Sequence, residues 1–407
     1  MWELIQANKR KSTVLIITMG LMLVLLGYII GSAYHPDGGG IVGIVIAFII
    51  WGILYLTAFS SGSKILLAVS GAKEVTKEVH PQLFNVVEEM KIASGYPFMP
   101  KIYIIDSAAP NAFATGIKPE NTAIAVTAGL LGRLNRDELQ GVIAHEMSHI
   151  VNRDILFMTV SGIMLGAIVL ISNLFIYSLW FGGGRGRYRS SSSRDSGQAQ
   201  LIFLAIAIIF AILGPIAAQL LYFAISRKRE YLADASGVRL TRYPEGLASA
   251  LEKISQSTID MPKANKVTAA MYIANPLKKK GERLHDLTST HPPISERIRI
   301  LRSIAHSADF AEYQNAFNKV KGKTSKIIPD SALKDVKPAG LRETGVIPLA
   351  GLTQKKTQRN VGDLIMKLND YSFINCPCGV KIKIPPDYKK NVVFCPRCGR
   401  EHSVVNH

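Results

Sequence analysis

The sequence predicts a mainly α-helical membrane protein with a small β-sheet beside a metal-binding helix and a zinc ribbon near the C-terminal end. Hydrophobic residues make up 48% of the 407 positions and the mean hydropathy is positive, which is typical of chains with membrane-spanning helices. The sequence His-Glu-x-x-His occupies residues 145–149 inside a helical run, a spacing that suits zinc. All four cysteines lie beyond position 375, in two close pairs.

Four stretches contain no charged residue over the length that a helix needs to cross a hydrocarbon core of about 30 Å. They are residues 12–33, 41–60, 155–181 and 201–226. The first can also be interpreted as a signal peptide, but its apolar run is too long for one and a second span follows directly. We therefore predict that residues 1–60 form an uncleaved N-terminal transmembrane hairpin.

The formal net charge is +18, which favours a partner of negative charge. Much of the positive charge flanks the apolar stretches, as at Lys9 and Lys64, or lies in the last hundred residues. This distribution predicts attraction to the lipid bilayer surface, and no nucleic acid is expected. Residues 34–40 contain no Lys or Arg, so the positive-inside rule places them outside and the soluble part of the chain in the cytoplasm. The predicted location is the inner (cytoplasmic) cell membrane, crossed several times.

A soluble segment follows the first two spans. Apolar residues at helical spacing predict a helix over 80–93, and short β-branched runs predict strands over 101–105 and 122–127. Asn135 can cap the next helix with Glu138 at its third position, an arrangement known as a capping box. The helix that begins there carries the two histidines.

His145 and His149 are four residues apart, so a helix presents both imidazoles on one face, roughly 6 Å apart along its axis. Glu146, next to the first histidine, can then reach a water molecule beside a metal held by the two rings. Two neutral nitrogen ligands and a carboxylate base are what a zinc hydrolase needs. A surface helix with two solvated histidines fits the same pattern, so a third ligand elsewhere has to decide between the two interpretations.

The third and fourth apolar stretches predict a helical hairpin at 155–226 that interrupts the soluble domain. Residues 182–200, between the two stretches, contain four arginines, which disagrees with a location outside the membrane. Either the hairpin is shallow or the earlier spans dominate the orientation. In both cases the chain returns to the side that it left, so that the histidine pair and the residues after 226 share a compartment.

Two carboxylates follow the fourth stretch at helical spacing, Glu230 and Asp234. One can bind the metal while the other orients a histidine by accepting its second ring N–H. A solvated, charged helix start at a membrane exit would have a similar sequence. A third protein ligand with an open water position is the mark of a catalytic rather than a structural zinc.

Together these motifs resemble the HtpX-type integral-membrane metalloproteases, which are related to the CAAX prenyl endopeptidases and to the wider gluzincin group. The resemblance covers about residues 1–305, with the motifs in the same order. Besides the helical pair and the apolar hairpin, it is carried by Asn152-Arg153-Asp154, by Glu230-Tyr231-Leu232-Ala233-Asp234, by Pro110-Asn111-Ala112-Phe113-Ala114-Thr115-Gly116, and by Thr290-His291-Pro292-Pro293 followed by Arg297.

The resemblance implies a gluzincin-type catalytic domain at 61–320, built of helices and a small β-sheet. It implies a catalytic zinc bound by His145, His149 and Glu230, with Glu146 as the general base and Asp234 supporting a ligand from behind.

The resemblance also implies roles for two motifs away from the metal ligands. The strand that contains Asn111, Ala112 and Phe113 would bind an extended substrate by β-augmentation, pairing its backbone with the peptide. His291 would lie near the metal and stabilise the oxyanion or cap the zinc in a resting state, although a turn residue before a proline is an equal interpretation. Arg297 is expected to hold the late segment onto the catalytic core.

The C-terminal region predicts a basic linker over 321–370, with a short helix at 361–368, and a zinc ribbon over 371–407. The ribbon is indicated by Cys376, Cys378, Cys395 and Cys398, a set of four thiolates that would hold a second, structural zinc. The first pair is Cys-x-Cys instead of the commoner Cys-x-x-Cys. A reducing cytoplasm disfavours disulfides, and His402 and His407 are expected to be bystanders. The sequence pattern of the HtpX-type proteases lacks this domain, and the sequence does not predict which partner it binds.

The predicted function is zinc-dependent endopeptidase activity on peptide bonds at the cytoplasmic face, which the resemblance assigns to quality control of misfolded membrane proteins under stress. One alternative is a CAAX-type processing protease that acts on one defined peptide. Another is a non-catalytic membrane adaptor that works through its ribbon. The complete set of metal ligands and base argues against the adaptor, because a scaffold has no need of a base beside its metal.

Overall fold

The computed structural model describes residues 2–35, 38–181, 194–261, 269, 271–276, 291–322, 326–334, 339–342, 354–388 and 390–404. Several parts of the sequence predictions lie outside these residues: residues 182–193 of the arginine-containing link, Thr290 of the late motif, residues 323–325, 335–338 and 343–353 of the linker, and His407.

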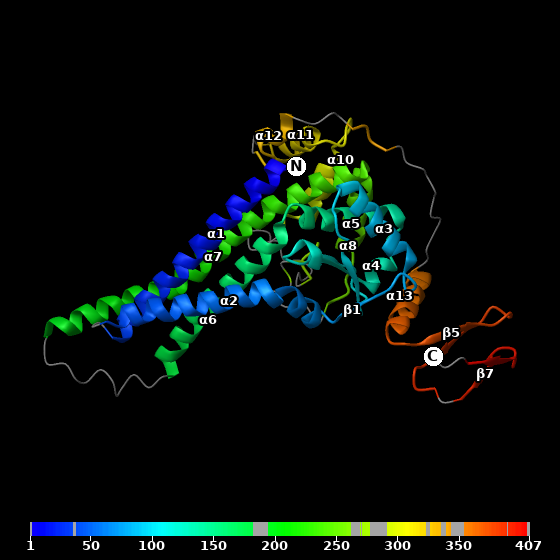
Figure 1. Ribbon diagram of the computed structural model, residues 1–407, viewed down its shortest axis with the longest axis horizontal. Helices are drawn as coiled ribbons and strands as arrows, with labels where there is room; N and C mark the ends of the chain where they lie inside the picture. Colours follow the sequence, from blue (N-terminus) through cyan, green and yellow to red (C-terminus); the bar gives the residue numbers. More distant parts are fainter. Residues whose placement is uncertain are drawn as a thin grey trace.

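Four long helices form an elongated bundle at one end of the molecule (Figure 1). Each is long and apolar enough to cross a membrane. They are α1 (Trp2–Tyr34), α2 (Gly39–Val69), α6 (Asp154–Phe181) and α7 (Arg194–Thr241). All four predicted spans are therefore confirmed as helices.

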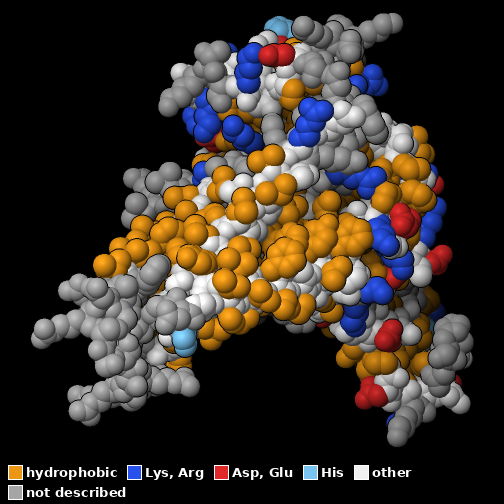
Figure 2. All heavy atoms as spheres, turned by 60° about the vertical axis from the view of Figure 1, so that its left-hand side comes forward, with side chains coloured by type: hydrophobic (Ala, Val, Ile, Leu, Met, Phe, Trp, Pro, Cys, Tyr) orange, Lys and Arg blue, Asp and Glu red, His pale blue; other side chains and the backbone are white. Residues whose placement is uncertain are grey.

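Large apolar side chains cover the outside of this bundle, as the orange area in Figure 2 shows. Val14, Ile41 and Phe48 expose 64%, 68% and 60% of their surface. An apolar surface of this extent is unfavourable in water and favourable in hydrocarbon. The helical bundle therefore belongs in a lipid bilayer, and the chain is a membrane protein.

Helix α7 is continuous from the membrane bundle into the soluble domain. Its 48 residues span about 72 Å at 1.5 Å per residue. The histidine helix α5 (Arg136–Val151), by contrast, is separated from α6 by a turn in which Arg153 adopts a left-handed conformation with φ of 61°. The chain thus leaves the soluble domain along α6 and returns along α7 (Figure 1).

A four-stranded sheet lies in the soluble domain, in the order β1-β2-β4-β3. Its strands are β1 (Ala72–Glu74), β2 (Lys101–Ile105), β3 (Ala112–Thr115) and β4 (Ala123–Thr127). Strands β2 and β4 are parallel, and the two outer strands pair antiparallel with their neighbours. The two strands predicted from β-branched runs are confirmed as the central pair, and β3 forms one edge.

Helix α5 is the centre of the soluble domain. Asn135 caps it in a complete capping box with Glu138, which confirms the predicted helix start. Every residue from Glu138 to Ile150 is buried. Helix α8 (Pro244–Ser255) packs so closely that a Cβ at Gly141 would lie 2.6 Å from the backbone nitrogen of Leu247, so only glycine fits there.

Other helices surround α5 and β3. Helix α3 (Pro81–Ser94) confirms the helix predicted over 80–93 and packs on α5. The 3₁₀ turn η1 (Pro119–Asn121) precedes β4, and the short helix α4 (Ala128–Leu131) follows it. Helices α10 (Ile294–Arg302) and α11 (Phe310–Lys321) add side chains to the same hydrophobic core.

The described parts of the predicted linker, residues 321–370, include helical residues, some of which pack on the soluble domain. They contain α12 (Asp330–Lys334) and α13 (Gln354–Leu368), longer than the predicted helix at 361–368. Val361 is buried in the main hydrophobic core of the soluble domain, where it lies against Gly132. The spacing of apolar residues alone could not show that this amphipathic helix packs on the soluble domain.

Two small hairpins end the chain beside α13 (Figure 1). One pairs β5 (Ser372–Asn375) with β6 (Lys381–Ile384), and the other pairs β7 (Val392–Phe394) with β8 (Glu401–Ser403). Each cysteine pair lies in the turn region of one hairpin, as zinc ribbons arrange their ligands.

Candidate active site

The two histidines of α5 lie at the buried heart of the soluble domain. His145 is fully buried and His149 is 6% exposed, which excludes the interpretation as solvated surface residues. Their ring centroids are 4.8 Å apart and the rings are nearly perpendicular. Glu146 is 1% exposed, so a carboxylate is buried directly beside the pair.

Helix α7 brings Glu230 to the histidines. Its Oε1 lies 3.3 Å from Nε2 of His149, and its Oε2 lies 3.7 Å from Nε2 of His145. One ligand atom from each of the three residues falls within 4.8 Å of the others. A stretch of more than 70 residues that includes the membrane hairpin separates these groups in the sequence, and the continuous helix α7 reunites them.

Asp234, one turn beyond Glu230, supports His145. Its Oδ1 lies 2.9 Å from Nδ1 of the imidazole. Arg297 of α10 binds the same carboxylate with two N–H groups, Nε to Oδ2 at 2.9 Å and Nη2 to Oδ1 at 2.7 Å. Arg297 is fully buried, and its Nη1 also lies 3.4 Å from Oε2 of Glu230. The guanidinium thus ties the late segment to α7, in agreement with the positioning role expected for it.

A second carboxylate supports the other histidine, and sequence reasoning gave it no role. Asp154 Oδ2 lies 3.1 Å from Nδ1 of His149, and its Oδ1 accepts a hydrogen bond of 2.6 Å from Nη1 of Arg229. The Arg229 guanidinium also stacks over the ring of Phe157, 3.7 Å from its centroid. The spacing from His149 to Asp154 exceeds one helical turn, so only the left-handed turn at Arg153 makes this contact possible.

His291 joins the same cluster. Its Nε2 lies 3.8 Å from Oε2 of Glu230, and its side chain is 4% exposed. Burial among the cations Arg297, His145 and His149 lowers the pKa of His291 to about 4, because desolvation disfavours the imidazolium. A neutral imidazole therefore faces the candidate ligands at neutral pH.

Burial also shifts the titration of the α5 residues. Desolvation raises the pKa of Glu146, against the opposing effect of the two histidines. For His149, burial alone would lower the pKa, but hydrogen bonds to Asp154 and Glu230 raise it to about 10. The pKa of His145 is raised in the same way by Asp234 and Glu230. The carboxylates around His145 and His149 thus favour positive charge at the two imidazoles.

The donor set fits a zinc ion. Nitrogen from two imidazoles and oxygen from one carboxylate are common zinc ligands, and both imidazoles have a carboxylate behind them. Within the described part of the chain, Oε2 of Glu146 and Oε2 of Glu230 are buried with no hydrogen-bond partner. Unsatisfied buried carboxylate oxygens are costly, and a cation with its water would satisfy both.

The predicted substrate strand lies at the sheet edge, but its free side is covered. Ala112 and Phe113 belong to β3, with Asn111 directly before it. The backbone N–H of Ile273 donates to the carbonyl of Ala112 at 2.9 Å. An internal segment therefore lies where the sequence placed an extended substrate.

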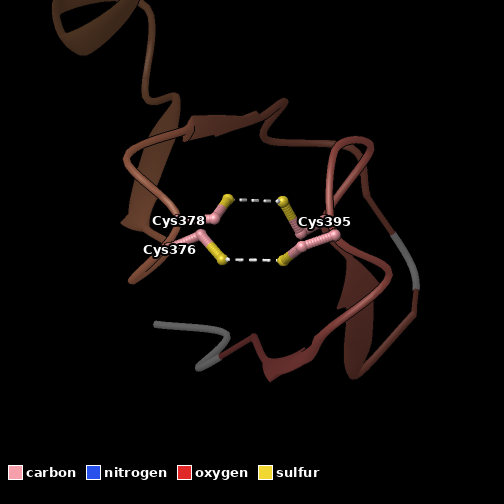
Figure 3. Close-up of side chains that lie close together, drawn as sticks. Cys376, Cys378 and Cys395 are labelled. Carbon is pink, nitrogen blue, oxygen red and sulfur yellow. Dashed lines mark hydrogen bonds between the residues drawn. The ribbon is translucent and has the colours of Figure 1, made fainter.

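The four cysteines meet at a second site, far from the first in the fold (Figure 3). The Sγ atoms of Cys376 and Cys398 are 3.4 Å apart, and those of Cys378 and Cys395 are 3.5 Å apart. None of these four cysteines forms a disulfide, and their Sγ atoms all lie within 4.8 Å of one another. The Cys-x-Cys spacing does not prevent a four-sulfur cluster.

A buried His-Glu-x-x-His pair with a third carboxylate, carried by helices that enter a bilayer, defines a class: this protein is a membrane-bound zinc metalloprotease. The chain belongs to Peptidase family M48, whose sequence model matches residues 77–305. The family resemblance inferred from the motifs is thereby confirmed. The cysteine cluster lies beyond the matched residues.

Curated relatives agree with this assignment. The chain is 46% identical over 301 residues to the "Protease HtpX homolog" of Dictyoglomus turgidum, covering 74% of this chain and 94% of the relative. It is 41% identical over 306 residues to the protein of the same name from Streptococcus uberis, covering 74% and 99%. Among solved structures, the crystal structure of S. mikatae Ste24p is similar over 74% of this chain and 67% of that chain, with 21% identity and a TM-score of 0.39.

Proposed function

We propose that His145, His149 and Glu230 hold the catalytic zinc, and that Glu146 is the general base of an endopeptidase acting at the cytoplasmic face of the cell membrane. The single observation that carries this proposal is the convergence of the three ligand groups, all buried, within 4.8 Å. The substrates proposed are misfolded membrane proteins, because one continuous helix, α7, contains both an apolar membrane-spanning stretch and the candidate ligand Glu230.

The chemistry follows from the positions of the side chains. Zinc, when bound, polarises a water molecule and the scissile carbonyl. Glu146 Oε2, which is free of hydrogen bonds among the described residues, takes the proton of the attacking water and returns it to the leaving amine. His291 faces the same region and would stabilise negative charge on the carbonyl oxygen.

The proposed orientation rests on charge and on the course of the helices. The N-terminus of α1 and the soluble domain lie at the same end of the bundle (Figure 1). The α1–α2 connection, at the other end, has no Lys or Arg between residues 34 and 40. By the positive-inside rule, the end of the bundle that carries the N-terminus and the soluble domain faces the cytoplasm.

The test is an assay of the purified full chain in detergent. An unstructured protein such as casein, a destabilised membrane protein and a prenylated peptide are offered with and without a zinc chelator. Chelator-sensitive cleavage of the first two, restored by added zinc, supports the proposal. Cleavage of the prenylated peptide alone would favour a processing protease, and no cleavage of any substrate would overturn the enzymatic proposal.

Asp154→Asn is expected to lower the affinity of the catalytic site for zinc by roughly 10- to 100-fold. The substitution removes the charge behind His149 and leaves Arg229 without its carboxylate. Competition with a chromogenic chelator measures the affinity directly, without an activity assay. Asp330→Asn, at an exposed aspartate paired with Lys326, is the matched control and should leave the zinc affinity unchanged. Equal affinities of Asp154→Asn and wild type would contradict the positioning role.

We further propose that Cys376, Cys378, Cys395 and Cys398 hold a structural zinc. Four thiolates leave no position for water, so this ion would stabilise the two hairpins instead of acting in catalysis. The hairpins contribute a hydrophobic cluster whose buried members include two of the cysteines, Cys376 and Cys395. Such a small core commonly needs a metal to fold.

Cys378→Ser is expected to reduce the zinc content from two ions per chain to one and to unfold the ribbon. The protease domain should keep its zinc, since the two sites share no ligand. Elemental analysis of the purified protein counts the ions, and proteolytic nicking after residue 370 reports the ribbon. Ser403→Ala, at an exposed residue of the same domain, serves as the control and should keep both zinc ions. Two zinc ions in Cys378→Ser would refute the tetrathiolate site.

A further inference from the structure

The free edge of β3 is occupied by the chain itself. The described segment 271–276 runs beside Asn111 and Ala112, and we call Tyr272–Ala274 the strap. The strap residues are buried, with exposed fractions of 1%, 1% and 8% along the three positions. The three residues form bends instead of a strand, and the backbone N–H of Ile273 binds this edge.

The strap uses the hydrogen-bonding groups that a peptide would need. The N–H of Ile273 donates to the Ala112 carbonyl at 2.9 Å. Asn111 holds the next residue from both sides: its Nδ2 donates to the Ala274 carbonyl at 2.9 Å, and its Oδ1 accepts the Ala274 N–H at 3.3 Å. One backbone hydrogen bond and the Asn111 side chain thus hold this segment against the free side of β3, where an added peptide strand would pair.

Two side chains extend the contact toward the candidate ligands. Arg297 Nη1 donates to the carbonyl of Ile273 at 3.1 Å, so the strap also occupies the guanidinium that lies beside Glu230. The ring of Tyr272 packs edge-to-face on Phe113 with centroids 5.1 Å apart. The strap therefore spans from an aromatic contact on β3 to the polar centre of the site.

We propose that the strap is an internal competitor of the substrate, and that a peptide gains access to β3 only by displacing Tyr272–Ala274. The inference rests on the proposed peptidase function and adds to it a regulatory step and a substrate class. The Ala112 carbonyl and the Asn111 side chain cannot bind the strap and a peptide together. The fraction of molecules with the strap released then multiplies the apparent affinity for substrate.

The strap also specifies what a successful competitor must offer. A substrate segment has to be extended, with free backbone groups, since it replaces hydrogen bonds from Ala112 and Asn111. It also has to supply a large apolar side chain where the Tyr272 ring contacts Phe113, because otherwise that buried surface is lost. Unfolded apolar segments of membrane proteins meet both requirements, whereas folded domains do not.

A pair of substitutions at one position isolates the backbone contact. Ile273→Pro removes the N–H that binds Ala112, while Ile273→Ala keeps it, and both lose the isoleucine side chain. The loss of one hydrogen bond predicts roughly fivefold higher kcat/KM for Ile273→Pro than for Ile273→Ala, mainly through a lower KM. Tyr272→Ala should act in the same direction for substrates with a large apolar side chain.

A second measurement follows the strap without catalysis. In Glu146→Gln, hydrogen exchange at the amides of Ile273 and Ala274 is compared with and without a bound apolar peptide. Displacement predicts faster exchange at both amides when the peptide is present. If the amides stay protected while the peptide binds, and Ile273→Pro is no more active than Ile273→Ala, the strap is a fixed part of the site and the inference fails with the peptidase function intact. If wild type and all variants neither cleave nor bind peptides, the proposed function fails and the inference with it.

Discussion

Glu146→Gln is expected to keep the catalytic zinc and to lose roughly 10²- to 10⁴-fold in kcat, the usual contribution of a general base. Glu146 is next to His145 in sequence, but its Oε2 is buried without a hydrogen bond in the described part of the chain. Burial raises the pKa of this carboxyl, which makes it a stronger base for the proton of water. The glutamine amide has the same shape and cannot take that proton.

The measurement combines zinc analysis with initial rates of peptide cleavage. Glu120→Gln, an exposed substitution of the same kind at the η1 turn, controls for the change of charge. An active, purified Glu146→Gln protein would contradict the mechanism. Loss of zinc together with activity would show a ligand role for Glu146, the role that we propose for Glu230 instead.

Local sequence patterns predicted those parts of the fold that depend on neighbouring residues. The apolar stretches, the helix over 80–93 and the central strands each follow from periodicity over one element. The start of α5 follows from Asn135 and Glu138, which are three residues apart and need no distant partner. For such features, tertiary packing selects what the local sequence already favours.

The contacts that sequence reasoning missed depend on an irregular turn or join distant segments. Asp154 reaches His149 only through the left-handed turn at Arg153. Arg229, which pairs with Asp154, follows the membrane hairpin in the sequence. The strap at Tyr272–Ala274 has no periodicity, and its role is visible only in the hydrogen bonds to Asn111 and Ala112. Helix α13 was recognised as a helix but not as part of the core, since its partner α4 is more than 200 residues away.

The same contacts couple the site to the membrane bundle. Asp154 begins α6 and Arg229 lies on α7, so their ion pair closes the hairpin at the point where both helices enter the soluble domain. Because α7 is continuous, a rotation of its membrane part would move Glu230 and Asp234 relative to α5. The geometry of the candidate zinc site is therefore set by how the hairpin packs.

Arg297→Gln is expected to destabilise the soluble domain by about 3–5 kcal/mol, the cost of removing one partner from a buried ion pair. Arg297 is fully buried, forms a two-bond fork with Asp234 and holds the Ile273 carbonyl. Glutamine would leave the Asp234 carboxylate charged and without the Arg297 cation, behind the proposed zinc ligand His145. Denaturant unfolding of the detergent-solubilised protein, followed by a probe of the soluble domain, measures the change in the free energy of unfolding.

The chain contains a matched control for this prediction on the same helix. Arg302 also pairs with two carboxylates, Glu245 and Glu252, but its side chain is 40% exposed. Arg302→Gln should cost no more than about 1 kcal/mol, because water replaces a lost surface ion pair. A similar loss for both variants would show that Arg297 contributes through charge alone. A much larger loss for Arg297→Gln would show that burial, not the number of ion pairs, makes this residue the link between α10 and the ligands on α7.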